Sequence, residues 1–136
     1  VAGIDLDASC EYAYTRNNNS QFVKKSIEDV TGKEVRHLLK GADVKVLVGC
    51  APCQPFSSHR KDKQHRSRHK DWKLLYQFGR LVKEVHPHIV SMENVPELAK
   101  EKVFADFVCI LRMEGYRVSC RWLTPLIMAF HKGERG

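Results

Sequence analysis

The fold is decided by one stretch of the chain, Val44-Lys45-Val46-Leu47-Val48-Gly49-Cys50-Ala51-Pro52-Cys53-Gln54-Pro55-Phe56-Ser57. Its first five residues have the nearly continuous apolar character of a strand buried in a parallel sheet. A stiff loop follows at once, because two prolines flank Cys53 and restrict the backbone around it. The stretch therefore predicts a buried strand that delivers one cysteine to the end of a sheet.

Strand and helix patterns alternate on both sides of this stretch. Besides residues 44–48, short apolar runs predict strands at residues 2–6, 22–23, 89–92 and 118–121. Apolar residues at helical spacing, or turn residues at the ends, predict helices at residues 8–16, 31–40, 74–85 and 103–111. This alternation predicts an α/β fold with a doubly wound, mostly parallel sheet, in which ligands bind at the carboxyl ends of the strands.

Reactive side chains follow three of the expected strands. Asp5 ends the first strand, Cys53 comes just after the third, and Glu93 comes directly after Met92. We therefore expect these three sites at one edge of one sheet. Asp5 fits the acidic residue that binds ribose hydroxyls in nucleotide-binding folds. An acidic helix start, which the helix dipole stabilises, explains Asp5 and Asp7 equally well.

Length and composition limit the class of protein to which the chain can belong. The chain has 136 residues, of which 43% are hydrophobic and 29% charged, so it is long enough for one modest core. No apolar run approaches the ~18 residues that a membrane helix needs. The N-terminus also lacks the succession of basic, apolar and small residues that marks a signal peptide, so we expect a soluble intracellular protein. Five cysteines in such a chain favour reduced thiols over disulfides, which leaves Cys53 free to react.

Positive charge is concentrated next to the stiff loop that contains Cys53, which we call the nucleophile loop. The net charge is +7, and residues 59–70 hold six basic side chains and three histidines against a single aspartate. We expect a surface loop that contacts nucleic acid, although a solvated run of charge explains the segment about as well.

Cys53 and Glu93 suit addition to a pyrimidine ring. A thiol of pKa ~8.5 is a few per cent thiolate at neutral pH, and the neighbouring positive charge raises that fraction. A cytosine ring accepts a nucleophile at C6 when N3 is protonated or strongly hydrogen-bonded, which a carboxyl group kept partly neutral by burial can do. Thiolate attack at C6 makes C5 carbanion-like, so that C5 can take a methyl group from a sulfonium donor.

Other interpretations of the same residues remain open. A lone cysteine is usually a small buried hydrophobe, and an isolated glutamate is usually a surface residue or a helix cap. Cys50 and Cys53 form a Cys-x-x-Cys pair typical of thioredoxin-like enzymes, but a basic loop follows it where those enzymes need a helix. Cys50, Cys53, His65 and His69 approximate a zinc-finger spacing, but Phe56 alone could fill its small core. We expect no metal site.

From residue 2 to about residue 121 the chain resembles the catalytic domain of the bacterial-type DNA (cytosine-5) methyltransferases. Two strings carry the resemblance, Val48–Ser57 around the nucleophile and Met92–Pro96 around the acid. The resemblance implies that Cys53 adds to C6 of a flipped-out cytosine while Glu93 engages N3 and the exocyclic amine. Asn94 would brace the nucleophile loop, and the flanking residues that would support the two groups are Pro52, Gln54 and Val95.

The resemblance also implies a Rossmann-like fold that binds S-adenosylmethionine. Asp5 would bind the ribose, Leu6 and Ile27 would lie against the adenine, and Leu74 would line the pocket. Ser26 stands where the family usually has an aspartate that reads the adenine amine.

Double-stranded DNA is the implied partner, in restriction-modification or genome marking, although one branch of the family methylates transfer RNA. The loop would close over DNA and offset the few kcal/mol needed to unstack a base. The implied contacts are Gln54, Ser57, Ser58, Arg60, Lys61, Lys63, Arg66 and Arg68.

Parts of the family pattern are not found. We expect residues 1–121 to be a partial catalytic domain that lacks the family's first strand, its glycine-rich turn and its target-recognition domain. Residues 122–136 are expected to be an out-of-frame tail, because codons for them exist that encode the family's Gln-x-Arg-x-Arg motif in a neighbouring frame. The chain alone is then expected to be inactive, either as a non-catalytic remnant or as one half of a split methylase that needs a complementary half.

Overall fold

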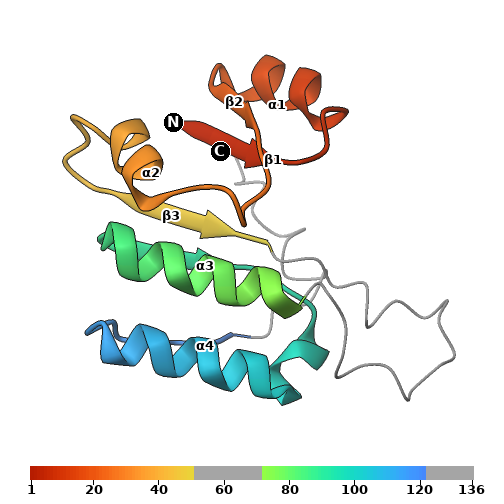
Figure 1. Cartoon of the computed structure of the whole chain (residues 1–136). Coiled ribbons are helices and arrows are strands. Elements are labelled where there is room, and N and C mark those ends of the chain that lie inside the picture. The colour runs from red at the N-terminus through yellow and green to blue at the C-terminus, as the bar shows by residue number, and fades with distance from the viewer. Residues whose placement is uncertain (51–71, 122–136) are drawn as a thin grey trace, which may run out of the picture.

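The computed structural model describes residues 1–50 and 72–121, and within them strands and helices alternate as expected (Figure 1). In chain order they are β1 (Ala2–Asp5), α1 (Cys10–Asn18), β2 (Gln21–Lys24), α2 (Gly32–Leu38), β3 (Val46–Gly49), α3 (Trp72–Val85), β4 (Ile89–Met92), a 3-10 helix (Pro96–Lys100) and α4 (Lys102–Met113). The α/β class is confirmed. No helix within these residues is long and apolar enough to cross a membrane.

The strands form two small parallel sheets rather than one. β1 pairs with β2, and β3 pairs with β4 in the register Val46↔Ile89 to Gly49↔Met92. The expectation of a single sheet is therefore wrong for the described residues, because no backbone ladder joins β1 to β3. The arrows of β1 and β3 nevertheless point the same way, so their carboxyl ends lie on the same side (Figure 1).

The expected strand at residues 118–121 does not form. These residues are irregular, since no described strand pairs with them. The segment is held by side chains instead: Val118 packs against the main core, and the hydroxyl of Tyr116 donates to the carbonyl of Pro87 at 2.5 Å. A strand needs a neighbour for its backbone groups, and an apolar pattern alone does not supply one.

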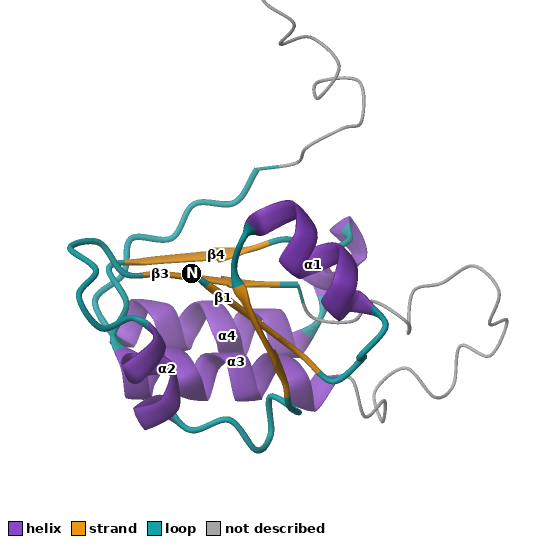
Figure 2. Ribbon diagram, turned by 90° about the horizontal axis from the view of Figure 1, so that it is seen from above, coloured by secondary structure: helices purple, strands orange, loops and turns teal. Residues whose placement is uncertain are grey.

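α3 and α4 lie against one face of β3–β4, as Figure 2 shows from above. Side chains alternate across the strands, so that Leu47, Val90 and Met92 pack on the helices while Val46 and Ile89 are exposed on the other face. The buried residues of this main core are Leu75, Phe78, Val82, Leu98, Val103, Phe107 and Leu111. The helical spacing in the sequence predicted both inward helix faces.

A second cluster connects the two sheets. Its buried members are Val30 and Val35, near and in α2, and Leu81 and Val85 on α3. Half-buried residues from both sheets pack against it, among them Ile4 of β1 and Leu47 of β3. The β1–β2 pair is thus attached to the rest of the molecule through apolar side chains and α2, not through strand pairing.

Candidate active site

The carboxyl ends of β3 and β4 bring two reactive side chains together. The ladder ends with Gly49 opposite Met92, and the backbone N–H of Glu93 then donates to the carbonyl of Gly49 at 3.2 Å. This extension of the pairing sets Cys50 beside Glu93, whose carboxylate Oε2 accepts a hydrogen bond from the Cys50 thiol with a sulfur–oxygen distance of 3.2 Å. The residue that precedes the nucleophile loop therefore contacts the expected acid.

The nucleophile itself and the basic segment lie outside the described residues. This applies to every expected contact to nucleic acid and to three members of the zinc-like set, whereas the fourth member, Cys50, is described. The residues concerned are Pro52, Cys53, Gln54, Ser57, Ser58, Arg60, Lys61, Lys63, His65, Arg66, Arg68 and His69. Their assignments stay predictions.

Glu93 is more open than its expected role suggests. Glu93 is exposed, whereas its expected task at N3 of the cytosine led us to expect a carboxyl group that is partly buried. Asn94 and Val95 are half-buried, and the Asn94 side-chain oxygen accepts from the Val95 N–H at 2.9 Å. Pro96 then starts the 3-10 helix, which directs the chain away from the strand end. The described residues therefore leave the Glu93 carboxyl group uncovered.

At the carboxyl end of β1, Asp5 and Leu6 are both exposed, Leu6 to 65%. One Asp5 carboxylate oxygen accepts from the Asp7 N–H at 2.8 Å, and the Asp7 carboxylate in turn accepts from the Ser9 N–H at 2.9 Å. Hydrogen bonds from the backbone and side chain of Ser9 lower the pKa of Asp7. Both acids thus shape the turn into α1, as the helix-start interpretation allowed.

Residues 25–31, which we call the β2–α2 loop, start beside Asp5. The Lys25 N–H donates to the Asp5 carbonyl at 3.0 Å, so the strand end and the loop share one edge. Ser26 accepts from Glu28 N–H through its hydroxyl at 3.3 Å, and Ile27 is half-buried against both apolar clusters. Leu74 is half-buried on α3. The structure thus brings Asp5, Leu6, Ser26 and Ile27 to one region.

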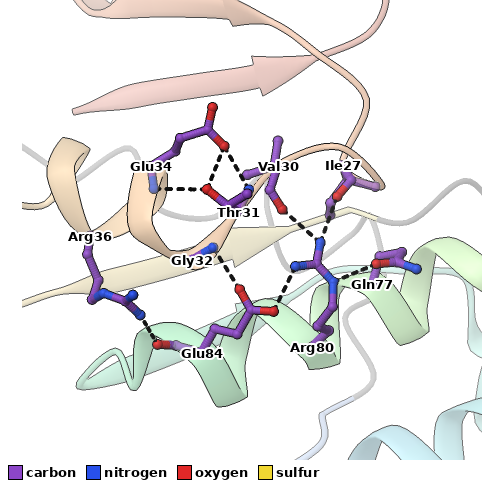
Figure 3. A network of polar contacts seen from close by, with 9 residues as sticks. All are labelled: Ile27, Val30, Thr31, Gly32, Glu34, Arg36, Gln77, Arg80 and Glu84. Atoms are coloured by element: carbon purple, nitrogen blue, oxygen red, sulfur yellow. Dashed lines mark hydrogen bonds and ion pairs between the residues drawn. The ribbon is translucent and has the colours of Figure 1, made fainter.

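Two charged residues of α3 that no sequence pattern singled out anchor this loop (Figure 3). The Arg80 guanidinium donates to the carbonyls of Ile27, at 3.1 Å, and Val30, at 2.8 Å. The Glu84 carboxylate accepts from the Gly32 N–H at 2.7 Å. The one sequence signal for them is the i, i+4 spacing of opposite charges, which normally indicates a surface pair.

No group of three metal-binding side chains gathers within residues 1–50 and 72–121. One hollow in the described surface lies along α4 and contains none of the expected site residues; it is lined by Phe104, Ala105, Val108, Cys109, Arg112 and Met113.

Comparison with known proteins gives one family. Residues 1–129 match the family model described as C-5 cytosine-specific DNA methylase. The chain is 46% identical over 122 residues to the Type II methylase M.HgiDII of Herpetosiphon aurantiacus, which covers 88% of this chain and 34% of the relative. It is 34% identical over 105 residues to the Type II methyltransferase M.XorII of Xanthomonas oryzae pv. oryzae, covering 75% and 24%. It is 30% identical over 121 residues to the Type II methyltransferase M.AluI of Cellulosimicrobium cellulans, covering 85% and 22%. The chain thus spans between about a fifth and a third of the length of these relatives.

Proposed function

The chain belongs to the C-5 cytosine-specific DNA methylase family, and from that premise we propose that Cys53 and Glu93 are the nucleophile and the acid of DNA cytosine-5 methylation. The observation that carries the proposal is the 3.2 Å contact between the Cys50 sulfur and the Glu93 carboxylate. Cys53 follows Cys50 by three peptide steps, which reach at most ~11 Å. A base held against Glu93 is therefore within reach of the Cys53 thiol.

Each group has one task in the proposed reaction. The Cys53 thiolate forms a bond to C6 of cytosine, and Glu93 hydrogen-bonds N3 and the exocyclic amine, so that the electron pair gathers at C5. S-adenosylmethionine supplies the methyl group when it is bound. A solvent water molecule then takes the C5 proton, and the electron pair that is released re-forms the C5–C6 double bond as the thiolate leaves C6, which returns the enzyme to its starting state.

The exposure of Glu93 fits a substrate nucleobase that enters the site from the solvent side. A base inside a duplex hides its reactive atoms, so enzymes of this chemistry extrude it into the site. An extruded cytosine would cover Glu93 and exclude water from it, which favours the protonated carboxyl that N3 needs. Burial of this group would then come from the substrate and not from residues 1–50 and 72–121.

The residues at the carboxyl end of β1 fit the adenosine part of the cofactor. The exposed Asp5 carboxylate has the chemistry to accept from ribose hydroxyls, and the exposed Leu6 offers an apolar surface for adenine. Ile27 would close the other side of the adenine, with Leu74 further along the pocket. Ser26 has no carboxylate for the adenine amine, so we expect weak cofactor binding.

The substrate and the whole enzyme's activity are proposals that rest on the relatives. Type II methylases are named among the relatives, which favours duplex DNA and a restriction-modification context over the transfer RNA branch. We propose that the basic segment of residues 59–70 contacts the DNA backbone.

A chimera tests the proposed chemistry. Residues 1–121 would replace the matching segment of M.HgiDII, and transfer of labelled methyl groups to duplex DNA would be measured. Activity should survive in the chimera and disappear with Cys53→Ser. Cys109→Ser is the matched control, because it makes the same atomic change at an exposed cysteine of α4 that is not among the expected site residues, and it should keep activity within about tenfold. A chimera that stays active with Cys53→Ser would refute the proposed nucleophile.

The alternative of an inactive remnant or a split enzyme has one observation in its favour. Among the described strands, β1 and β3 each pair on one side only, which leaves an edge where a further strand could add. We expect the isolated chain to methylate neither DNA nor transfer RNA when both are assayed side by side. Methylation of either by the isolated chain contradicts this expectation, and activity restored by a co-expressed partner would establish the split form.

A further inference from the structure

The β2–α2 loop depends on one side chain of α3 for its shape. The Arg80 Nη2 atom donates to two of its carbonyls, those of Ile27 at 3.1 Å and Val30 at 2.8 Å. These contacts span 53 and 50 residues of sequence. A planar guanidinium can serve two acceptors at once in fixed geometry, which a lysine ammonium cannot reproduce. Arg80 thus fixes the loop at two points three residues apart.

Arg80 is itself held in place from its own helix. Its Nε donates to the Gln77 side-chain oxygen at 2.7 Å, and its Nη1 donates to the Glu84 carboxylate at 2.9 Å (Figure 3). The side chain of Arg80 is only 33% exposed. All three nitrogen atoms of the guanidinium thus donate hydrogen bonds, to four acceptor oxygens in total. The guanidinium therefore has little freedom to turn away from the loop.

Glu84 fixes the far end of the same loop. Its second oxygen accepts from the N–H of Gly32, the first residue of α2, at 2.7 Å. A Cβ atom at position 32 would lie 2.5 Å from the Glu84 Cβ, so the helix start fits here only as glycine. Hydrogen bonds to Arg80 and to the Gly32 N–H, the first being the larger cause, lower the pKa of Glu84. The pair therefore clamps both the loop and the helix that follows it.

The clamped loop lies where a nucleotide would bind. It follows β2 and is bonded through Lys25 to the last residue of β1, so it borders the carboxyl ends of both parallel strands. Within the loop, the Asp29 N–H donates to the Ser26 carbonyl at 3.0 Å and the Glu28 N–H donates to the Ser26 hydroxyl at 3.3 Å. These local turns do not fix where Ile27 stands relative to β1. That placement comes from α3.

From these contacts we propose that Arg80 is a positioning residue for the cofactor site, which holds the β2–α2 loop so that Ser26 and Ile27 face the adenosine held by Asp5. The proposal rests on the proposed function for the identity of the ligand. The anchoring of the loop by Arg80 is independent of the proposed function, because it can be measured without any ligand.

The experiment compares Arg80→Met and Arg80→Lys with a matched control, Arg112→Met, which removes the same charge and the same donors from an exposed site on α4. Hydrogen exchange of residues 25–31 is measured by mass spectrometry on the ligand-free chain, and the affinity for S-adenosylmethionine is measured separately. Arg80→Met should speed exchange in the loop about tenfold and weaken the affinity about tenfold. Arg80→Lys should fall between, and Arg112→Met should change neither.

Glu84→Gln distinguishes the effect of the Arg80–Glu84 ion pair from the effect of the hydrogen bonds between Arg80 and the loop carbonyls. It removes the charge that Arg80 meets on its own helix but leaves the two loop carbonyls and an acceptor for Gly32, so affinity should change less than threefold. If Arg80→Met does not fold, Arg80→Lys, which keeps the charge, decides the matter by the same two measurements.

The outcomes are distinct. Unchanged loop exchange in both Arg80 variants refutes the anchor. Faster exchange with unchanged affinity refutes the cofactor role. Faster exchange in a chain whose unsubstituted form binds no S-adenosylmethionine supports the anchor and counts against the proposed function.

Discussion

Replacing Gly49 with alanine should overfill the contact between β3 and α3. A Cβ atom at this position would lie 2.9 Å from Cζ of Phe78 and 3.0 and 3.1 Å from its two Cε atoms. Ordinary contact to a Cβ atom begins at 3.4 Å. Phe78 is 5% exposed and stacks on Phe107 with ring centroids 5.6 Å apart, so its ring has no free space to enter. Either the strand end or the ring must shift.

Two opposing effects set the size of the loss. Overpacking of a filled core costs about 1–3 kcal/mol. Gly→Ala also restricts the unfolded chain, which by itself stabilises the fold by about 0.4–1 kcal/mol. The net loss for Gly49→Ala is then about 0–2.6 kcal/mol in the free energy of unfolding, with a midpoint of about 1.3 kcal/mol. The melting temperature of a chain of this size should fall by roughly 3–5 °C per kcal/mol.

A double-mutant cycle shows whether the Phe78 ring is the cause. Phe78→Leu removes the ring atoms that the new Cβ would meet, at the cost of a cavity. Urea unfolding would be followed by circular dichroism for Gly49→Ala, Phe78→Leu and the double variant. The double variant should be less destabilised than the sum of the two, by about 0.5–1.5 kcal/mol.

The control for this cycle is Gly41→Ala. Gly41 has φ +82°, and a Cβ atom added there would meet no other atom within 4 Å, so its cost comes from backbone strain alone and should add to that of Phe78→Leu. Additive costs, within ~0.3 kcal/mol, for Gly49→Ala and Phe78→Leu would refute the steric reasoning.

Three further predictions concern the ends of α2 and α4. Thr31→Ala removes the side-chain oxygen that accepts from the Glu34 N–H at 3.3 Å and should cost about 1 kcal/mol in urea unfolding, whereas Thr31→Ser should cost little. The Lys25 ammonium at 2.6 Å, and then Thr31, lower the pKa of Glu34 from 4.5 to about 2, so the stability that this group contributes is present above pH 4.5 and is lost as the pH falls towards 2. A carbon NMR titration of Glu34 with a midpoint near 4.5 would contradict this, and Lys25→Met should raise the midpoint. Tyr116→Phe removes the donor to the Pro87 carbonyl and should cost about 1 kcal/mol by the same unfolding assay; an unchanged stability would mean that the bond contributes nothing.

The sequence alone determined the local elements and the chemistry of the key residues. The strand expected at residues 89–92 is β4, and the apolar faces expected on two helices are the faces that α3 and α4 bury. Periodicity and turn residues act within a few positions of the chain, so they can be read without knowing what packs on what. The strings around Cys53 and Glu93 likewise pointed to the family that the comparison found.

Only the tertiary structure decided which segments meet. It paired the strands in two sheets, left residues 118–121 without a partner strand among the described residues, and set Cys50 against Glu93, 43 residues later. It also gave Arg80 and Glu84 their task on a loop some 50 residues earlier, a task for which the sequence analysis singled out neither residue. Such contacts depend on the packing of whole helices and strands against one another, and a local pattern carries no record of its distant partner. The residue types set the possible chemistry, and packing chose which of them stand together.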